Sequence, residues 1–256
     1  MTEQTDETLV VPRRFRGPAT SGNGGWTSGA LAELLALPGQ AVRVRPSAPP
    51  PLEVPMTILR DRPSAIAQHD GSPVLTATLV AGGEPDGLDP VPPVAYEAAL
   101  RAGERYAGLH DHPFPECFAC GPARASGDGL RLRPGPLDPA VAGVDVAAAW
   151  SPGEGDLQVD GAVPVPILWA ALDCPGGWSV DIVGRPMVLG TMTARVLGRP
   201  GYEERCVVTG RAVHVGERKA LTATSLYGQS GELLATAAHV WVAVDPATFG
   251  RTGSGP

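Results

Sequence analysis

The sequence has no excess of positive charge, no long apolar run and few cysteines. Its formal net charge is −7, so it offers no basic stripe for nucleic acid, and an anionic membrane surface would repel it. No apolar run reaches the length needed to span a bilayer. Four cysteines in 256 residues are too few for a disulfide scaffold. We therefore expect neither nucleic acid nor a membrane among the partners.

The amino-terminal residues also lack the apolar core of a secretory signal. The stretch MTEQTDETLVVPRRF is acidic and then basic, whereas a signal peptide needs a continuous apolar segment. We therefore expect a cytoplasmic protein whose cysteines stay reduced. The remaining composition, 43% hydrophobic and 18% charged, is that of an ordinary globular protein.

Glycine and proline are abundant and separate short runs of β-like sequence. The 33 glycines and 28 prolines are spread along the chain, which favours many turns between strands over disorder. Helices are predicted over residues 29–37, 94–107 and 165–174, and a proline- and glycine-rich linker over 82–93. Strands are predicted over 41–45, 53–60, 64–81 (a hairpin turning at Asp70-Gly71), 129–134, 143–150, 187–197, 205–216, 219–228 and 232–244.

The order of these elements repeats. Each half has a helix followed by three or four strands, and GSPVLTAT (71–78) aligns with GELLATAA (231–238) at a glycine and a threonine. A duplicated helix-plus-antiparallel-sheet unit predicts an α+β fold in which the two units pair as a pseudo-dimer. We assign an N-terminal unit to residues 1–93, a linker with a helix to 94–112, and a C-terminal unit to 113–256.

Three motifs carry a resemblance to a known family. NGGW (residues 23–26) precedes the first helix, CFACG (117–121) is followed by GL (129–130), and Asp173 lies in the helix of the second half. With the order of elements, they resemble the hotdog-fold acyl-CoA thioesterase superfamily, including its double-hotdog, PaaI-like and TesB-like members. The resemblance covers most of residues 15–245 and implies a double hotdog.

The same resemblance suggests a chemistry for the first motif. Thioester hydrolysis builds negative charge on the carbonyl oxygen, and a helix N-terminus offers free N–H groups and a positive dipole end. Because glycine has no Cβ, Gly24 and Gly25 would let the carbonyl approach these groups. We therefore expect them to hold the oxyanion. The plainer alternative is a tight turn before a helix.

Asp173 is the expected base. PaaI-like members carry their catalytic aspartate at this position, and a carboxylate within the apolar run WAALDC (169–174) would have its pKa raised by burial. Alternatively, Asp173 caps a local turn, because Pro175-Gly176-Gly177 follows and the helix could end there.

In hotdog dimers, as the resemblance implies, the helix mouth and the carboxylate come from different units. One site would then combine residues 23–25 with Asp173. The reciprocal site would combine residues 164–166 with the helix near Glu33. Its prolines have no N–H to donate, and Glu33 is one position off, a rotation of about 100°. We expect one working site and one decayed site, and a structure with Asp173 far from Gly25 would contradict this.

The resemblance also suggests partners for Asp173. In double-hotdog thioesterases an Asp–Thr–Gln set holds the water. Thr191 would be its second member, and Gln68 or Gln229 its third.

Three residues at the helix mouth are expected to bind substrate. Asn23 replaces the family's histidine, and it would either cap the helix or donate to the substrate. Trp26 would fill the core or line an acyl tunnel. Thr27 follows it in the same motif.

The CxxC motif of Cys117 and Cys120, with His110 and His112 nearby, is one half of a zinc site. Because no second CxxC is present, a structural turn into the predicted strand 129–134 is favoured, and no metal or redox cofactor is expected.

The remaining cysteines and histidines are expected to be structural. Cys174 and Cys206 lie in apolar runs, which favours core positions. His69, His214 and His239 lie in predicted strands, as exposed or hydrogen-bonded core histidines.

The expected function is hydrolysis of an acyl thioester, acyl-CoA or an acyl-carrier thioester, with CoA entering only as part of the substrate. An alternative is a non-catalytic acyl-binding or assembly protein of the same fold, favoured by the missing histidine at Asn23 and the prolines at 164–166. A hydratase of this fold is disfavoured, because we find no strand–loop Asp…His pair. The resemblance also allows a homodimer of double hotdogs.

Overall fold

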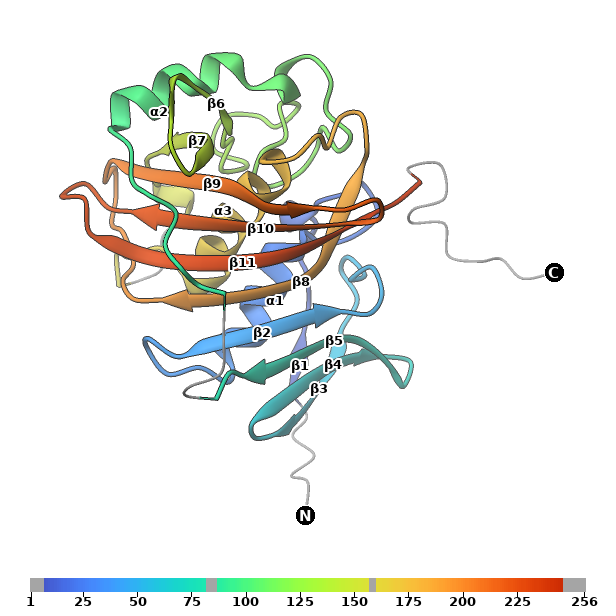
Figure 1. The fold of residues 1–256 in the computed structure, drawn as a ribbon. Helices are drawn as coiled ribbons and strands as arrows, with labels where there is room; N and C mark the ends of the chain where they lie inside the picture. Colours follow the sequence, from blue (N-terminus) through green and yellow to red (C-terminus); the bar gives the residue numbers. More distant parts are fainter. Residues whose placement is uncertain (1–6, 82–86, 157–159, 246–256) are drawn as a thin grey trace.

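The computed structural model describes residues 7–81, 87–156 and 160–245. Over them the chain forms one antiparallel sheet with two helices packed against one of its faces (Figure 1). The predicted linker and the outer ends of both predicted units lie partly outside these residues. In this part of the chain, no helix combines the length and apolar character needed to cross a membrane.

The elements follow the predicted order. The helices are α1 (Gly24–Glu33), α2 (Tyr96–Ala102) and α3 (Val165–Trp178), with 3-10 turns η1 (Arg13–Phe15), η2 (Gly103–Arg105), η3 (Ala107–Leu109) and η4 (Glu154–Asp156). The first half supplies strands β1 (Thr8–Leu9), β2 (Ala41–Pro46), β3 (Met56–Asp61), β4 (Ser64–His69) and β5 (Ser72–Leu79). The second half supplies β6 (Gly135–Val141), β7 (Val144–Trp150), β8 (Met187–Val196), β9 (Cys206–Val215), β10 (Lys219–Tyr227) and β11 (Leu233–Ala243).

The strand order confirms the predicted repeat. The sheet runs β1-β3-β4-β5-β2-β8-β11-β10-β9-β7-β6. Counted outward from its centre, β2-β5-β4-β3 in the first half corresponds to β8-β11-β10-β9 in the second. The two halves meet where β2 and β8 pair antiparallel, with Val42 opposite Ala194. One continuous sheet therefore joins the two units.

The predicted hairpin is confirmed, and the backbone conformation of its two turn residues accounts for it. Asp70 and Gly71 have φ angles of 48° and 73°, the left-handed values that a two-residue hairpin turn requires and that Asp-Gly adopts readily. The strands predicted over 143–150 and over the last four segments of the chain are confirmed as β7 and β8–β11.

Helix α1 begins five residues earlier than the sequence predicts, at Gly24 rather than Gly29. Asn23 explains this start, because its side chain accepts a hydrogen bond of 2.8 Å from the backbone N–H of Trp26. This is the N-cap geometry that satisfies one of the free donors of a helix. Gly24 and Gly25 therefore form the first turn of the helix.

Helices α1 and α3 pack closely because glycines face the contact. A Cβ on Gly25 would lie 2.5 Å from the Cβ of Asp173, and one on Gly29 would lie 2.7 Å from the Cβ of Trp169. Glycine costs a helix roughly 1 kcal/mol relative to alanine. Here it permits an approach that no side chain would allow, and the N-terminus of α1 consequently lies beside the C-terminal half of α3.

Helix α3 extends four residues beyond its predicted end at Cys174. Pro175 lies inside it, where it removes one N–H donor and ordinarily kinks or ends a helix. The carbonyl of Leu172 accepts a hydrogen bond of 3.0 Å from Thr224 Oγ1 of β10, and every residue from Pro166 to Trp178 is buried. Tertiary packing thus maintains the last turn.

The strand predicted over 129–134 is wrong. These residues do not join the sheet; instead the N–H groups of Leu130 and Leu132 donate to the carbonyls of Phe118 and Ala119 at 2.9 Å. Their alternation of buried leucines and exposed arginines is real, but it reflects packing on the 117–120 loop. The helix predicted over 94–107 is shorter than expected and continues as 3-10 turns.

Candidate functional site

A cavity of about 270 Å³ opens at the boundary between the two halves of the chain. The N-terminus of α1, the C-terminal half of α3, strands β8 and β11, and the segments 46–50 and 112–120 contribute to its wall. Its apolar surface comes mainly from large side chains: Phe114, Trp178, Ile182, Met187, Leu189 and Trp241. The polar groups gather where α1 meets α3.

Asp173 is the central polar group of this cavity. Its side chain is only 3% exposed, and its Oδ2 accepts a hydrogen bond of 2.9 Å from the backbone N–H of Gly25. Among the described residues its Oδ1 has no hydrogen-bond partner. The predicted proximity of Asp173 to Gly25 is therefore confirmed, and one buried carboxylate oxygen is left without a hydrogen-bond partner among the described residues.

Burial governs the acidity of Asp173. Removal from water raises the pKa of this carboxyl to about 7, the Gly25 N–H opposes the rise, the nearby Cys117 adds to it, and the Asn23 amide opposes it. A carboxyl with a pKa near neutrality can exchange a proton with water at physiological pH.

Asn23 connects three parts of the site. Its Oδ1 caps α1, while its Nδ2 lies 3.4 Å from Asp173 Oδ2 and 3.6 Å from Cys117 Sγ. The predicted capping role is therefore confirmed. The same side chain also donates a hydrogen bond of 3.4 Å to the carboxylate.

The two glycines of the motif differ in the use of their N–H groups. The N–H of Gly25 is engaged by Asp173. The N–H of Gly24 has no acceptor within the described residues, and Gly24 lines the cavity. The unengaged N–H of Gly24 therefore belongs to a cavity-lining residue at the positive end of the α1 dipole.

Trp26 and Thr27, which the sequence places with the substrate-binding residues, point into the protein. Trp26 stacks on Phe15 with ring centroids 4.2 Å apart, and the Thr27 hydroxyl donates to the Asn23 carbonyl at 2.8 Å. Neither lines the cavity. Both stabilise the start of α1.

The predicted water-holding partners also lie outside the cavity wall. The hydroxyl of Thr191 donates to the carbonyl of its neighbour Gly190 at 2.7 Å. Of these two residues, Gly190 lines the cavity and Thr191 does not. Gln68 lies on β4 opposite Thr57, and Gln229 accepts from the Arg205 N–H in a surface turn. Within the described residues the structure brings none of the three to Asp173, so their role stays a prediction.

A cluster of three thiols forms part of the same wall. Cys117 and Cys120 come from the loop that follows α2, and Cys174 comes from α3 next to Asp173. The CxxC spacing was a visible signal. Cys174 gave no such signal, because only the fold brings it close to the other two cysteines.

A second cavity, of about 350 Å³, occupies the pseudo-symmetric position. It contains Glu33 of α1 and Val165 at the N-terminus of α3. Burial raises the pKa of Glu33, and the Arg199 guanidinium opposes the rise. The helix mouth here is Pro164-Val165-Pro166, which has no glycine and no capping side chain. The reciprocal position therefore has a carboxylate but lacks the open backbone of the first site.

No family model and no curated protein sequence matches this chain. Solved structures match it over nearly its whole length. A candidate thioesterase from Novosphingobium aromaticivorans DSM 12444 is 15% identical, with a TM-score of 0.63 over 95% of this chain and 98% of that one. A tesB protein from Mycobacterium avium subsp. paratuberculosis is 14% identical, with a TM-score of 0.56 over 89% of each chain.

A third similar structure is described by its fold. It is a conserved protein of unknown function with a hot dog fold from Alicyclobacillus acidocaldarius, 14% identical, with a TM-score of 0.51 over 95% of this chain and 98% of that one. At such identities the likeness concerns the fold. Together with the duplicated helix and the duplicated strand order, it identifies this chain as an α+β double hotdog.

Proposed function

We propose that this protein hydrolyses the thioester of a small acyl group, carried by coenzyme A, in the cavity between its two hotdog units. The observation that carries the proposal is the buried carboxylate of Asp173, which lies against the N-terminus of α1 with one oxygen unpartnered. Two fold relatives named as a thioesterase and a tesB protein support the reaction class.

The cavity supplies the oxyanion site. A substrate carbonyl directed at the Gly24 N–H would lie at the first turn of α1, where free donors and the helix dipole favour negative charge. One such donor typically contributes about 3 kcal/mol to the transition state. The sequence suggests that Gly25 helps to hold the oxyanion. In this proposal its N–H instead orients the Asp173 carboxylate.

Asp173 would activate the water. The water oxygen attacks the carbonyl carbon, and its proton passes to the Asp173 carboxylate, whose buried Oδ1 has no hydrogen-bond partner among the described residues. Collapse of the tetrahedral intermediate breaks the carbon–sulfur bond. The same proton then goes to the leaving sulfur, which yields a thiol and a carboxylic acid, and Asp173 returns to its starting state.

The cavity walls limit the size of the acyl group. The apolar side chains described above surround the polar end, and the volume of about 270 Å³ lies just below the range of about 300–1,000 Å³ usual for ligand cavities. The site therefore suits a short or compact acyl group better than a long chain.

A non-catalytic acyl-binding protein is the second candidate. A specific observation favours it. The Asp173 carboxylate occupies the Gly25 N–H, which leaves, as far as the described residues go, a single free donor at the helix mouth. A protein of this kind would keep the pocket and bind the thioester without cleaving it.

Thiol release from a panel of acyl-CoAs, from short to long and aromatic, tests the proposal. We expect wild-type protein to release thiol with a preference for small acyl groups. Asp173→Asn should slow release about 100-fold or more, whereas Glu33→Gln, the matched change in the second cavity, should not affect it. Binding without release by the wild type would favour the second candidate, and loss of release in Glu33→Gln would contradict the assignment of the site.

A further inference from the structure

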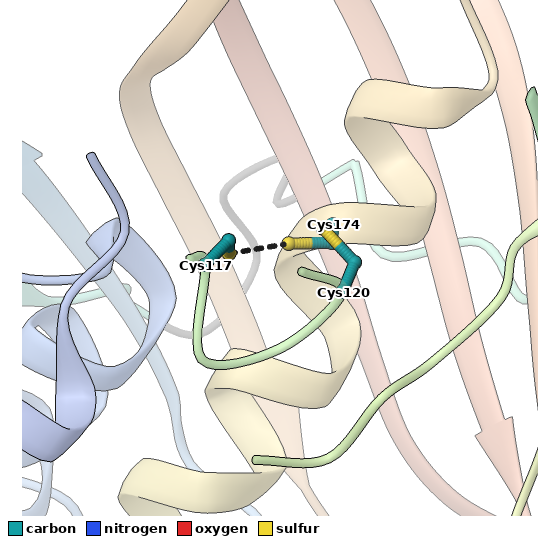
Figure 2. A group of neighbouring side chains, drawn as sticks. All are labelled: Cys117, Cys120 and Cys174. Carbon is teal, nitrogen blue, oxygen red and sulfur yellow. Dashed lines mark hydrogen bonds between the residues drawn. The ribbon is translucent and has the colours of Figure 1, made fainter. Parts of the chain in front are cut away.

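The three cysteines in the wall of the cavity form a compact group. Figure 2 shows their side chains turned toward one another, two from the loop and one from α3. Their sulfur atoms all lie within 4.8 Å of one another, and the Cys117 and Cys174 sulfurs are 3.6 Å apart. All three are buried, with exposures of 7% or less.

These separations suit a single metal ion. Zinc binds thiolate sulfur at about 2.3 Å, so two sulfurs of a tetrahedral site lie about 3.8 Å apart. The Cys117–Cys174 separation of 3.6 Å is close to this value, and the other pairs lie within 4.8 Å. A disulfide needs about 2.05 Å and could pair only two of the three. A 4Fe–4S cluster would hold its cysteines farther apart, because each of them binds a different iron.

Nitrogen donors surround the sulfurs. The Asn23 amide lies 3.6 Å from Cys117 Sγ, and His112 Nε2 lies 3.3 Å from Cys120 Sγ. His112 Nδ1 accepts the Phe114 N–H at 2.9 Å, so in the neutral imidazole the proton is on Nε2 and is donated to sulfur. Neutral thiols are weak acceptors. Donors of this kind suit thiolates, as do the outer hydrogen bonds of metal sites.

The loop that carries two of the cysteines is fixed by its own hydrogen bonds. The Cys117 carbonyl accepts the Gly121 N–H at 2.8 Å, and the Cys120 carbonyl accepts the Tyr106 hydroxyl at 3.0 Å. A Cβ on Gly121 would lie 2.4 Å from the Pro115 carbonyl, so this tight turn after the CxxC motif requires glycine. The ligands are thus oriented before any ion arrives.

We propose that Cys117, Cys120 and Cys174 bind one thiophilic divalent metal ion, zinc in the cell, as a three-thiolate site in the wall of the cavity. His112 donates to a ligand sulfur and is not itself a ligand. The cavity provides an entry path and room for water as the fourth ligand. The proposal replaces the expectation, drawn from the CxxC motif alone, of a purely structural turn without a metal.

Metal content is the direct test. We expect wild-type protein, purified without chelator, to contain about one zinc per chain, and the apoprotein to give a thiolate-to-cobalt charge-transfer band when cobalt(II) is added. Cys120→Ser and Cys174→Ser should each weaken zinc binding at least tenfold in a chelator competition. Cys206→Ser is the matched control, because Cys206 is buried in β9 outside the cluster, and it should bind zinc as the wild type does.

Circular dichroism on each variant separates loss of metal from loss of fold, and a folded Cys174→Ser protein with weakened zinc binding supports the proposal. Three results would overturn it: a wild-type apoprotein that gives no cobalt charge-transfer band, undiminished zinc affinity in Cys174→Ser, or a disulfide within the cluster in protein that takes up no metal. None of these readouts depends on thioester hydrolysis, so the metal site and the proposed function can fail separately.

Discussion

The backbone N–H of Gly25 on the first helix donates a hydrogen bond of 2.9 Å to the carboxylate of Asp173 on the second. This bond joins residues 148 positions apart and spans the boundary between the two halves of the duplicated fold. It holds one carboxylate oxygen, while the other, the buried Oδ1, has no hydrogen-bond partner in the part of the chain that the structure describes.

Gly25→Ala should destabilise the protein by about 2–3 kcal/mol, the upper part of the range for overpacking. The added Cβ would lie 2.5 Å from the Cβ of Asp173 and 2.6 Å from the Trp169 carbonyl, so the helices must move apart. Urea unfolding measures the change. Gly153→Ala is the control, because its Cβ would meet no atom closer than 4.0 Å; equal effects of the two substitutions would refute the packing argument.

Asn23 has two separable functions, and two substitutions distinguish them. Asn23→Ala removes the cap of α1 and should cost about 1 kcal/mol of stability. Asn23→Ser keeps an oxygen that can cap the helix but lacks the amide nitrogen near Asp173 and Cys117. We expect the serine variant to retain most of the stability while losing thioesterase activity. Full activity in the serine variant would show that the amide does not position the carboxylate.

Leu189→Trp should fill the cavity and raise KM at least tenfold. Leu189 lines the cavity beside Gly24, whose Cβ position is 3.0 Å from the leucine side chain. Leu221→Trp, at a surface position of β10 that is 40% exposed, is the control. Steady-state kinetics with the best acyl-CoA compare the two, and an unchanged KM in Leu189→Trp would mean that substrate binds elsewhere.

The buried side chain of His239 should make the stability of the protein depend on pH. Its side chain is 2% exposed on β11, and burial lowers its pKa to about 4, an effect that its hydrogen bond with Thr222 partly offsets. The unfolded chain takes up a proton below about pH 6.5, while the folded protein does not. Stability should therefore fall as pH decreases from about 6.5 to about 4, by up to about 3 kcal/mol from this group.

Urea unfolding at several pH values measures this dependence. His239→Gln should reduce it, and His214→Gln, at an exposed position of β9, should leave it unchanged. A slope that is identical in wild type and His239→Gln would refute the assignment.

Much of the fold could be predicted from local sequence patterns. The Asp70-Gly71 turn determines its hairpin by backbone preference alone, and the long alternating runs at the end of the chain form strands as predicted. The strand predicted over 129–134 failed because alternation records which side chains are buried, not what buries them. Leu130 and Leu132 bury against the cysteine loop rather than within the sheet.

The site was predictable in part. Glycines before a helix and a carboxylate in an apolar run indicated the residues that the fold brings together. The direction of the Gly25 N–H, the inward orientation of Trp26 and the approach of Cys174 to Cys117 were not predictable. Each depends on how segments far apart in the sequence, or a helix and a neighbouring turn, pack together. Contacts of this kind arise from packing and leave no periodic signal.

The kinetics of Asp173→Asn test the central claim most directly. Asparagine matches aspartate in shape and can still accept the Gly25 N–H, but it cannot take a proton from water. With the acyl-CoA that the wild type cleaves fastest, we expect kcat to fall about 100-fold or more while KM stays within about threefold. A variant that keeps most of its kcat would contradict the assignment of Asp173 as the base.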